Sequence, residues 1–235
     1  MMNPFFRRLA LLTGDNAIEA LEKSRVIVFG LGGVGSWCAE ALVRSGLGNI
    51  SLVDADTIRE SNINRQVQAA AGNIGRLKAE ALAERLLEIN PACRVSSFPS
   101  FFSGETAGLF DIPGTDYVID AIDTLACKLD LIETAAASGK RLFSSMGMGQ
   151  KLDPTLIKTA DIWDTSGCPL ARLVRQGLKK RNFTGHFTAV YSPERRPGPA
   201  VEEAPKKPIG SAVMVTAAAG MALASLVLRD LVSRE

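Results

Sequence analysis

Histidine and paired cysteines are nearly absent from this chain. Its 235 residues include a single histidine, His186, and four cysteines, none of which belongs to a CxxC pair. A structural zinc site takes about four Cys or His ligands, so the sequence argues against one. Scattered thiols without a disulfide framework are typical of a reducing, cytosolic environment.

An excess of charge and a signal peptide are also lacking. The 27 Lys and Arg residues nearly balance the 25 Asp and Glu residues, leaving a net charge of +2, which argues against wholesale electrostatic wrapping of nucleic acid. A local basic patch remains compatible with this balance. The first residues lack the long apolar core and small-residue cleavage site of a signal peptide, so we expect a cytoplasmic protein.

Long hydrophobic runs are missing except at the C-terminal end. Residues 209–228 are twenty consecutive uncharged residues, which is about the length of a bilayer span. They are rich in Ala, Gly, Ser and Thr, and such small residues suit a helix pressed closely against other protein segments. We therefore expect residues 209–235 to form a C-terminal core helix, with membrane association through 209–228 as the less favoured alternative.

Strand-like and helix-like segments alternate over residues 1–150. Apolar runs predict strands, and apolar residues spaced three and four apart predict helices. This alternation predicts an α/β fold that is Rossmann-like, with a mostly parallel sheet covered by helices on both faces. The expected strands are 25–29, 49–56, 93–102 and 116–123, with a further strand that runs into a glycine-bearing loop over 140–149. The expected helices are 13–23, 37–45, 74–89 and 125–138.

The pattern loosens in an elaborated C-terminal half. An extended segment is expected at 153–163, a helix with a basic face at 169–181, and a mobile excursion rich in proline and charge at 192–208. We expect one domain, 1–235, in which a nucleotide-binding core (1–150) precedes a substrate-side segment with a mobile loop (151–208) and the C-terminal helix (209–235). The basic face either contacts nucleic-acid phosphates or is simply solvated, and the sequence leaves both open.

A glycine-rich turn follows the first strand. Gly30, Gly32 and Gly35 stand between an apolar strand and a predicted helix, whose first amides would point at a phosphate. Asp54 lies about twenty residues further on, near the spacing of a ribose-binding acid. The alternative for Asp54 is a capping or turn carboxylate. The context predicts a nucleotide site.

Cations and a carboxylate downstream indicate which nucleotide binds. Arg65 offers a planar fork and Lys78 a point charge, both suited to the outer phosphates of a triphosphate. Asp123 follows the strand expected at 116–123 and could hold Mg²⁺ together with phosphate oxygens; Asp120 either supports it or is structural. Cys168 could be a nucleophile at a helix start, but an unreactive thiol is the favoured interpretation. Cys38 and Cys127 are expected to be small core residues.

Several motifs together resemble a known group of enzymes. GLGGVGS, LVDADTIRESNINRQ, GRLKAEALAERLLEINP and YVIDAIDT resemble the ThiF, MoeB and HesA superfamily, ATP-dependent relatives of the ubiquitin-activating enzymes. The later segments GQKLDPTLIKTADIWDTSGCPLARLVRQGLKKR and VYSPERRP are most similar to its tRNA threonylcarbamoyladenosine dehydratase branch. The resemblance implies a single ThiF-type domain, a homodimer, ATP and Mg²⁺ as cofactors, and tRNA as the partner that is modified.

The resemblance also implies roles for individual residues. Arg65, Lys78, Asp123 and Arg8 would be catalytic, with Asp123 as the magnesium ligand and Arg8 reaching across the dimer into the partner's site. The ATP phosphates would lie over the glycine turn and the ribose at Asp54. The implied nucleotide-binding residues are Gly30, Gly32, Gly33, Gly35, Ser36, Asp54, Asp56, Asn62, Arg65, Gln66 and Lys78.

The implied reaction closes the threonylcarbamoyl side chain on itself with loss of water. A carboxylate is a poor electrophile, and ATP would turn its oxygen into a leaving group. Three alternatives compete: adenylation of the C-terminal glycine of a ubiquitin-like sulfur carrier, NAD-linked hydride transfer, and a nucleotide-binding adaptor beside a cysteine desulfurase. Arg65 and Lys78 argue against NAD-linked hydride transfer. Their presence together with Asp123 argues against a nucleotide-binding adaptor without activity. The missing CxxC pairs and the second-half motifs favour tRNA over the carrier.

Overall fold

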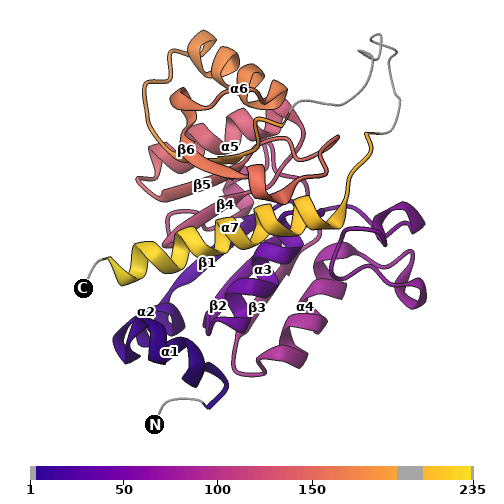
Figure 1. Cartoon of the computed structure of the whole chain (residues 1–235), viewed down its shortest axis with the longest axis vertical. Helices are drawn as coiled ribbons and strands as arrows, with labels where there is room; N and C mark the ends of the chain where they lie inside the picture. The colour runs from indigo at the N-terminus through magenta and orange to yellow at the C-terminus, as the bar shows by residue number, and fades with distance from the viewer. Residues whose placement is uncertain (1–3, 195–208, 234–235) are drawn as a thin grey trace.

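A single sheet forms the centre of the computed structural model, which describes residues 4–194 and 209–233. Within these residues seven strands pair in the order β3-β2-β1-β4-β5-β7-β6 (Figure 1). Every pair is parallel except β6 with β7. The strands are β1 (Arg25–Phe29), β2 (Asn49–Val53), β3 (Arg94–Phe98), β4 (Tyr117–Asp120), β5 (Arg141–Ser145), β6 (Lys158–Asp161) and β7 (Thr188–Tyr191).

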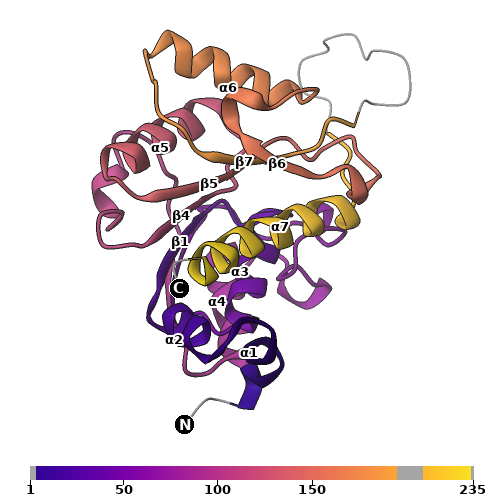
Figure 2. The same cartoon turned by 60° about the vertical axis from the view of Figure 1, so that its left-hand side comes forward.

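Helices cover both faces of this sheet (Figure 2). Successive residues of a strand point to opposite faces, and in β1 Val26 and Val28 enter one apolar cluster whereas Ile27 and Phe29 enter the other. The first cluster is completed by α3 (Gly35–Arg44), α4 (Lys78–Ile89) and α7 (Val213–Val232), and the second by α5 (Leu125–Ala137) and α6 (Pro169–Lys180). The predicted α/β fold with a mostly parallel, doubly covered sheet is confirmed.

The C-terminal helix α7 packs along α3, as expected for a core helix. A Cβ at Gly220 would lie 2.5 Å from the carbonyl oxygen of Val34 and 2.9 Å from the amide nitrogen of Cys38, so only glycine allows this close approach. Val215 and Leu223 are buried on the packed side, while Met214 is exposed on the other. By length and composition alone, α7 is also a candidate to cross a membrane.

The observed ends of several strands and helices differ from the expected ones, mainly where the chain leaves the sheet. The strands expected at 49–56 and 116–123 end at Val53 and Asp120, so the carboxylates beyond them lie in loops. The helix expected at 74–89 begins only at Lys78. The short helix α1 (Arg7–Thr13) precedes α2 (Asp15–Lys23) and, like β7, has no counterpart among the expectations. Most of the excursion expected at 192–208 lies outside the described residues.

Candidate functional site

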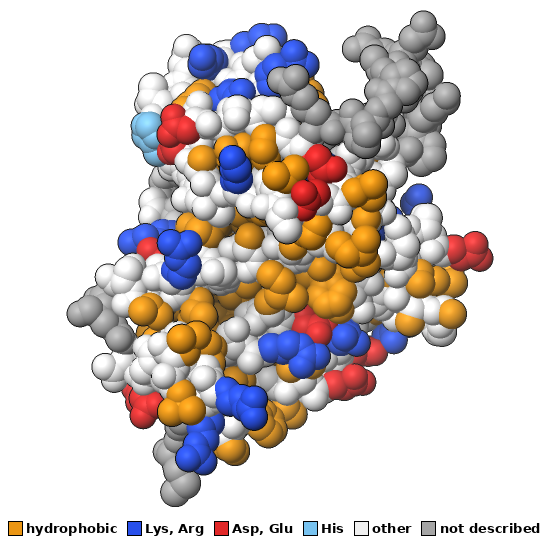
Figure 3. All heavy atoms as spheres, in the orientation of Figure 1, with side chains coloured by type: hydrophobic (Ala, Val, Ile, Leu, Met, Phe, Trp, Pro, Cys, Tyr) orange, Lys and Arg blue, Asp and Glu red, His pale blue; other side chains and the backbone are white. Residues whose placement is uncertain are grey.

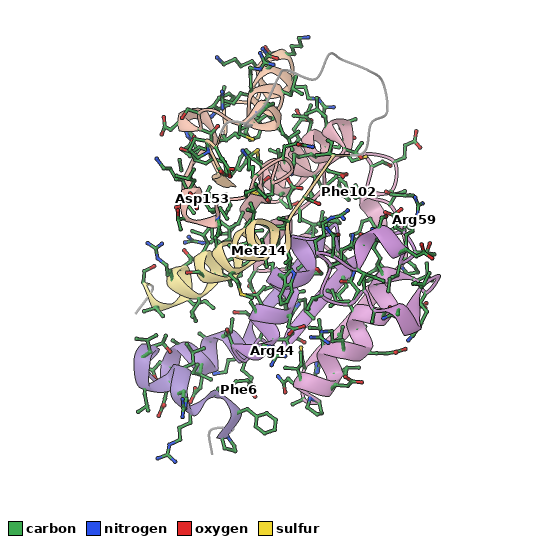
Figure 4. The ribbon with its side chains drawn as sticks, turned by 45° about the vertical axis from the view of Figure 1, so that its right-hand side comes forward. Phe6, Arg44, Arg59, Phe102, Asp153 and Met214 are labelled. Atoms are coloured by element: carbon green, nitrogen blue, oxygen red, sulfur yellow. The ribbon has the colours of Figure 1, made fainter. Side chains whose placement is uncertain are left out.

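A cavity of about 990 Å³ lies at the carboxyl ends of the central strands, where ligands of such sheets bind. Figure 4 labels Arg59 and Phe102 on its walls and Phe6, at the start of the chain, at the opposite end of the molecule. Gly35, Ser36 and Arg8 do not line this cavity. The expected site residues that do line it are Gly30, Gly32, Gly33, Asp54, Asp56, Asn62, Arg65, Gln66, Lys78 and Asp123.

The glycine turn is shaped by contacts that a side chain would break. Gly30 has φ +86°, and a Cβ there would lie 2.7 Å from the Ala121 carbonyl oxygen. A Cβ on Gly35 would lie 1.9 Å from the Gly30 carbonyl oxygen. The buried Ser36 hydroxyl donates to the Gly32 carbonyl at 2.7 Å and accepts from the Val67 amide at 3.3 Å. Gly35 and Ser36 therefore support the turn from behind.

Asp54 ties the glycine turn to the loop after β2. One of its oxygens accepts from the Leu31 amide at 2.7 Å and the other from the Asp56 amide at 2.8 Å. Burial raises the pKa of the Asp54 carboxyl, opposed by Lys78 and by these two amides. Asp54 thus has the turn-capping role considered as the alternative, and its remaining lone pairs leave room for a ribose hydroxyl.

Lys78 is held at the cavity by two carboxylates. Its ammonium lies 2.7 Å from an Asp56 oxygen and 3.8 Å from an Asp54 oxygen, and the residue is buried at the first turn of α4. The same turn is anchored by the Lys78 amide, which donates to the Asp56 carbonyl at 3.0 Å. A cation so placed can contact phosphates while its own charge stays compensated.

Arg65 comes from the segment between η2 (Glu60–Asn62) and α4. Its guanidinium donates to the Ser61 carbonyl at 2.8 Å and to the Asn64 side-chain oxygen at 3.0 Å. Among residues 4–194 and 209–233 no carboxylate lies within 4.0 Å of it, as the ion pairs show. The indole of Trp37 donates to the Arg65 carbonyl at 2.9 Å and fixes the backbone. Arg65 therefore brings to the cavity a positive charge that no carboxylate of the described segments compensates.

Two polar side chains near Arg65, Asn62 and Gln66, differ in whether their side-chain oxygens have hydrogen-bond donors. Asn62 is satisfied within the chain, because its side-chain oxygen accepts from the Arg59 amide at 3.0 Å. Gln66 is buried, yet its side-chain oxygen has no hydrogen-bond partner. A buried acceptor without a donor costs about 1–3 kcal/mol. The groups that fit a nucleotide with Mg²⁺ are instead Arg65, Lys78 and the exposed Asp123, which all line the cavity.

Asp120, the last residue of β4, and Asp123, in the loop that follows, differ in burial and in their partners. Asp123 is exposed at the cavity. Asp120 is fully buried, 2.7 Å from the ammonium of the equally buried Lys128, and it accepts from the Ser144 hydroxyl at 2.6 Å and the Ile122 amide at 3.0 Å. Of the two roles considered for Asp120 the structural one is observed: it holds the loop that carries Asp123.

No group of three or more potential metal-ligating side chains occurs in the part of the chain that the structure describes. Mg²⁺ does not require such a group, because it takes one or two protein carboxylates and completes its shell with phosphate oxygens and water. Asp123 would be such a carboxylate.

The cysteines agree only in part with the expectations. Cys38 is a core residue as expected, and burial raises the pKa of its thiol well above the ordinary value. Burial likewise raises the pKa of Cys93 to about 11. Cys127, also expected in the core, is half-buried and lines the cavity, which corrects that expectation. Cys168 is buried with its sulfur 3.9 Å from the Gly147 carbonyl oxygen, consistent with an unreactive thiol.

The basic face of α6 carries fewer free charges than its sequence indicates. Arg181 lies 2.7 Å from both Asp130 and Glu133 of α5, and these hydrogen bonds raise the pKa of its guanidinium. Arg175 donates to the Thr165 hydroxyl. Three exposed cations have no ion pair among the described residues: Arg172, Lys179 and Lys180.

Two cavity residues were missed by the sequence analysis. Lys151, from the loop after β5, is buried, and Glu194 lies beyond β7. No motif singled them out, because a lysine and a glutamate 43 residues apart resemble surface charges until the fold brings them together.

Comparison with known proteins places these features in a family. The model of the ThiF family matches residues 6–230. A tRNA threonylcarbamoyladenosine dehydratase from Bacillus subtilis (strain 168) is 41% identical over 189 residues, covering 80% of this chain and 74% of that protein. One from Escherichia coli (strain K12) is 36% identical over 251 residues, covering 97% and 94%. The crystal structure of the E. coli enzyme in complex with ATP matches with a TM-score of 0.88 at 35% identity, covering 97% of this chain and 94% of that chain.

Proposed function

Because this chain belongs to the ThiF family, we propose that it is an ATP-dependent tRNA threonylcarbamoyladenosine dehydratase. The observation that carries this proposal is the similarity to the E. coli enzyme, which runs through 97% of the chain and so includes the second half. The cavity supports it, since Arg65, Lys78 and Asp123 all line it and supply the two cations and the carboxylate that a triphosphate with Mg²⁺ would use. None of these three residues has an evident purpose in hydride transfer.

The proposed reaction removes one water from the modified nucleoside. A carboxylate oxygen of the threonylcarbamoyl group bonds to a phosphorus of ATP, which breaks a phosphoanhydride bond. A nitrogen or oxygen of the same side chain then attacks the activated carbonyl carbon and loses its proton, and the carbon–oxygen bond to the phosphate group breaks. The substrate oxygen leaves on phosphate. The protein's contribution is positioning and charge stabilisation, so no protein nucleophile is needed.

The site residues take the following proposed roles. Gly30, Gly32 and Gly33 face the phosphates, with Gly35 and Ser36 behind them, and Asp54 holds the ribose. Arg65 and Lys78 contact the triphosphate, and Asp123 binds Mg²⁺. Asp56 supports Lys78 through the 2.7 Å contact, while Asn62 and Gln66 line the same wall.

One incubation tests the proposed function. The protein is mixed with ATP, Mg²⁺ and tRNA that carries threonylcarbamoyladenosine, and digested nucleosides are examined by mass spectrometry. We expect loss of one water from that nucleoside, dependent on both ATP and Mg²⁺. A parallel arm contains a ubiquitin-like carrier ending in diglycine. Adenylation of the carrier with no change in the tRNA would replace the proposal by the carrier-activating alternative.

An apolar face supports the proposed homodimer. Leu11 and Leu12 of α1 are 83% and 82% exposed, and Met214 and Met221 of α7 are exposed as well. Figure 3 shows apolar side chains gathered over α7 on the face that also presents α1. A second copy of the chain would bury them. We favour this over membrane association, since the opposite side of α7 is already packed on α3. We further propose that the enzyme is cytoplasmic and that a cysteine desulfurase or sulfur-acceptor system is a partner.

Arg8 is proposed to act across the dimer. It is exposed on α1 and does not line the cavity of its own chain. If it completes the partner's site, Arg8→Ala and Asp123→Ala are each inactive alone, but mixed dimers contain one intact site. Refolding or co-expressing the two variants together is expected to restore about a quarter of the wild-type rate, because half of the dimers are mixed and each has one working site. No recovery in verified mixed dimers would show that Arg8 does not act in trans.

The exposed cations of α6 are proposed to contact tRNA phosphates. Changing Arg172, Lys179 and Lys180 to glutamate should weaken tRNA binding, most strongly at low salt, because counterion release contributes less when phosphate contacts are lost. ATP affinity should stay unchanged. Arg181 is left intact, since its replacement by glutamate would also place three acidic groups together with Asp130 and Glu133. Filter binding at several salt concentrations measures the tRNA affinity of the variant and of wild type. The same affinity and salt dependence in both would show that these cations do not contact tRNA and that the face is only solvated.

A further inference from the structure

A second buried lysine lines the cavity, in addition to Lys78, and it comes from the loop after β5. Lys151 is 4% exposed, and its ammonium donates to the Glu194 carbonyl oxygen at 2.8 Å. Among the described residues no carboxylate lies within the 4.0 Å of an ion pair, in contrast to Lys78. An ammonium has three N–H donors. Lys151 therefore has N–H donors and a charge that no carboxylate within residues 4–194 and 209–233 pairs.

The loop that carries Lys151 is held in place from both sides. The carboxylate of Glu194 accepts from the Leu152 amide at 2.9 Å and from the Asp153 amide at 3.1 Å. The Gln150 amide donates to the Gly210 carbonyl at 2.8 Å, and Gln150 itself has φ 61°, a conformation that non-glycine residues rarely adopt. Asp153, at the end of this loop, is labelled in Figure 4. Such a fixed backbone positions the side chain of Lys151 in advance of binding.

The order of the strands puts Lys151 on the far side of Asp123 from the nucleotide residues. Along the sheet the neighbours are β2, β1, β4 and β5. Asp54 follows β2, the glycine turn follows β1, Asp123 follows β4, and Lys151 follows β5. With phosphates over the glycine turn, a reacting group that approaches from the β5 side comes to them by way of Asp123. Lys151 lies on that path.

The chemistry of this wall matches one end of the proposed substrate. The cavity that Lys151 lines is also lined by the apolar residues Met148, Leu170, Leu173 and Ile209, which can contact the flat face of a base. A buried charge is favourable only when it is paired. Threonylcarbamoyladenosine supplies both features, a purine ring and a single carboxylate that has to be close to the phosphates in order to react.

We propose that Lys151 binds the carboxylate of the threonylcarbamoyl group and orients it toward the phosphates of ATP. This proposal rests on the proposed function, because it assigns a residue to the substrate of that same site. Lys151 is then the residue that distinguishes an acidic modified adenosine from a neutral one. The other anion in the site, the triphosphate itself, is the competing occupant for this ammonium.

Paired ligands test the assignment without turnover. Anticodon stem-loops carrying threonylcarbamoyladenosine or its neutral methyl ester compete for the protein in the presence of a non-hydrolysable ATP analogue. Wild type is expected to prefer the acid by roughly 10- to 100-fold, the range of a charge-assisted hydrogen bond. Lys151→Gln keeps a donor for the Glu194 carbonyl but loses the charge, so this preference should vanish, whereas Lys151→Arg should retain most of it.

Further variants distinguish the effect of the Lys151 charge from a change in the loop after β5, and the failure of this assignment from the failure of the proposed function. Lys158→Gln removes an exposed lysine of β6 outside the cavity and should leave the acid preference intact. If Lys151→Gln keeps the preference, or loses ATP affinity while keeping it, Lys151 does not bind the substrate carboxylate. Thermal unfolding of each variant reports folding, and Lys151→Arg covers the case in which the glutamine variant fails to fold. Absence of water loss in wild type would instead refute the proposed function.

Discussion

Replacing Arg65 by alanine is expected to lower the rate of ATP-dependent water loss by about 10³-fold, the scale on which an arginine stabilises phosphoryl-transfer charge. Arg65 lines the cavity, held by the Ser61 carbonyl and the Asn64 side chain, and its charge is not paired with a carboxylate among the described residues. The charge is therefore available to phosphates. Single-turnover reactions with modified tRNA, followed by mass spectrometry of the nucleosides, measure the rate.

Two further variants show what Arg65 contributes. Arg65→Lys keeps the charge but loses the planar fork, so its rate should lie between those of wild type and Arg65→Ala. Arg76→Ala is the matched control, because Arg76 is exposed, pairs with Glu84 and lies outside the cavity. Its rate should equal that of wild type. An unchanged rate in Arg65→Ala would remove Arg65 from the proposed mechanism.

Replacing Lys128 by methionine is expected to lower the free energy of unfolding by about 3–5 kcal/mol, because Asp120 would remain as an uncompensated buried charge. Both side chains of this pair are 0% exposed and their charged atoms are 2.7 Å apart. Domains are stable by only about 5–15 kcal/mol, so the loss is a large share of the total. Urea unfolding followed by circular dichroism measures it.

A double variant distinguishes the lost pair from a packing defect. Asp120→Asn with Lys128→Met removes both charges and keeps an acceptor for the Ile122 amide, so it should be more stable than Lys128→Met alone. The exposed pair of Arg76 and Glu84 provides a comparison, and Arg76→Met should barely move the urea midpoint. If Lys128→Met unfolds at the wild-type urea concentration, the buried pair does not stabilise the fold.

Local patterns were sufficient to predict the sheet-and-helix alternation. Strand β1 is apolar on both faces, which is what a parallel strand covered by two helical layers requires. The glycine turn was equally readable, since Gly30 and Gly35 occupy positions that no side chain tolerates. The ends of the elements were less predictable: the apolar residues of 74–77 continue the spacing of α4, yet the chain there is tied back to the loop after β2, as in the Lys78 amide bond to the Asp56 carbonyl.

Pairings across the chain could not be predicted, because they depend on which segments meet. β7 is only four residues long and is held between β5 and β6 by partners on both sides. Arg181 looked free until α6 docked on α5 and brought Asp130 and Glu133 to it. The sequence already favoured Asp123 over Asp120 as the metal ligand but left two roles open for Asp120, and only its burial beside Lys128 shows the structural one.

The sequence by itself determined the class of fold, the nucleotide turn and the residue types around it, because each follows from short-range spacing along the chain. The tertiary structure decided which of those residues face the cavity, moving Gly35 and Ser36 behind the turn and Cys127 to the wall. It also decided that Lys151 lines the cavity and bonds to the Glu194 carbonyl, since whether a lysine is paired with a carboxylate depends on distances in space that the order of residues does not specify.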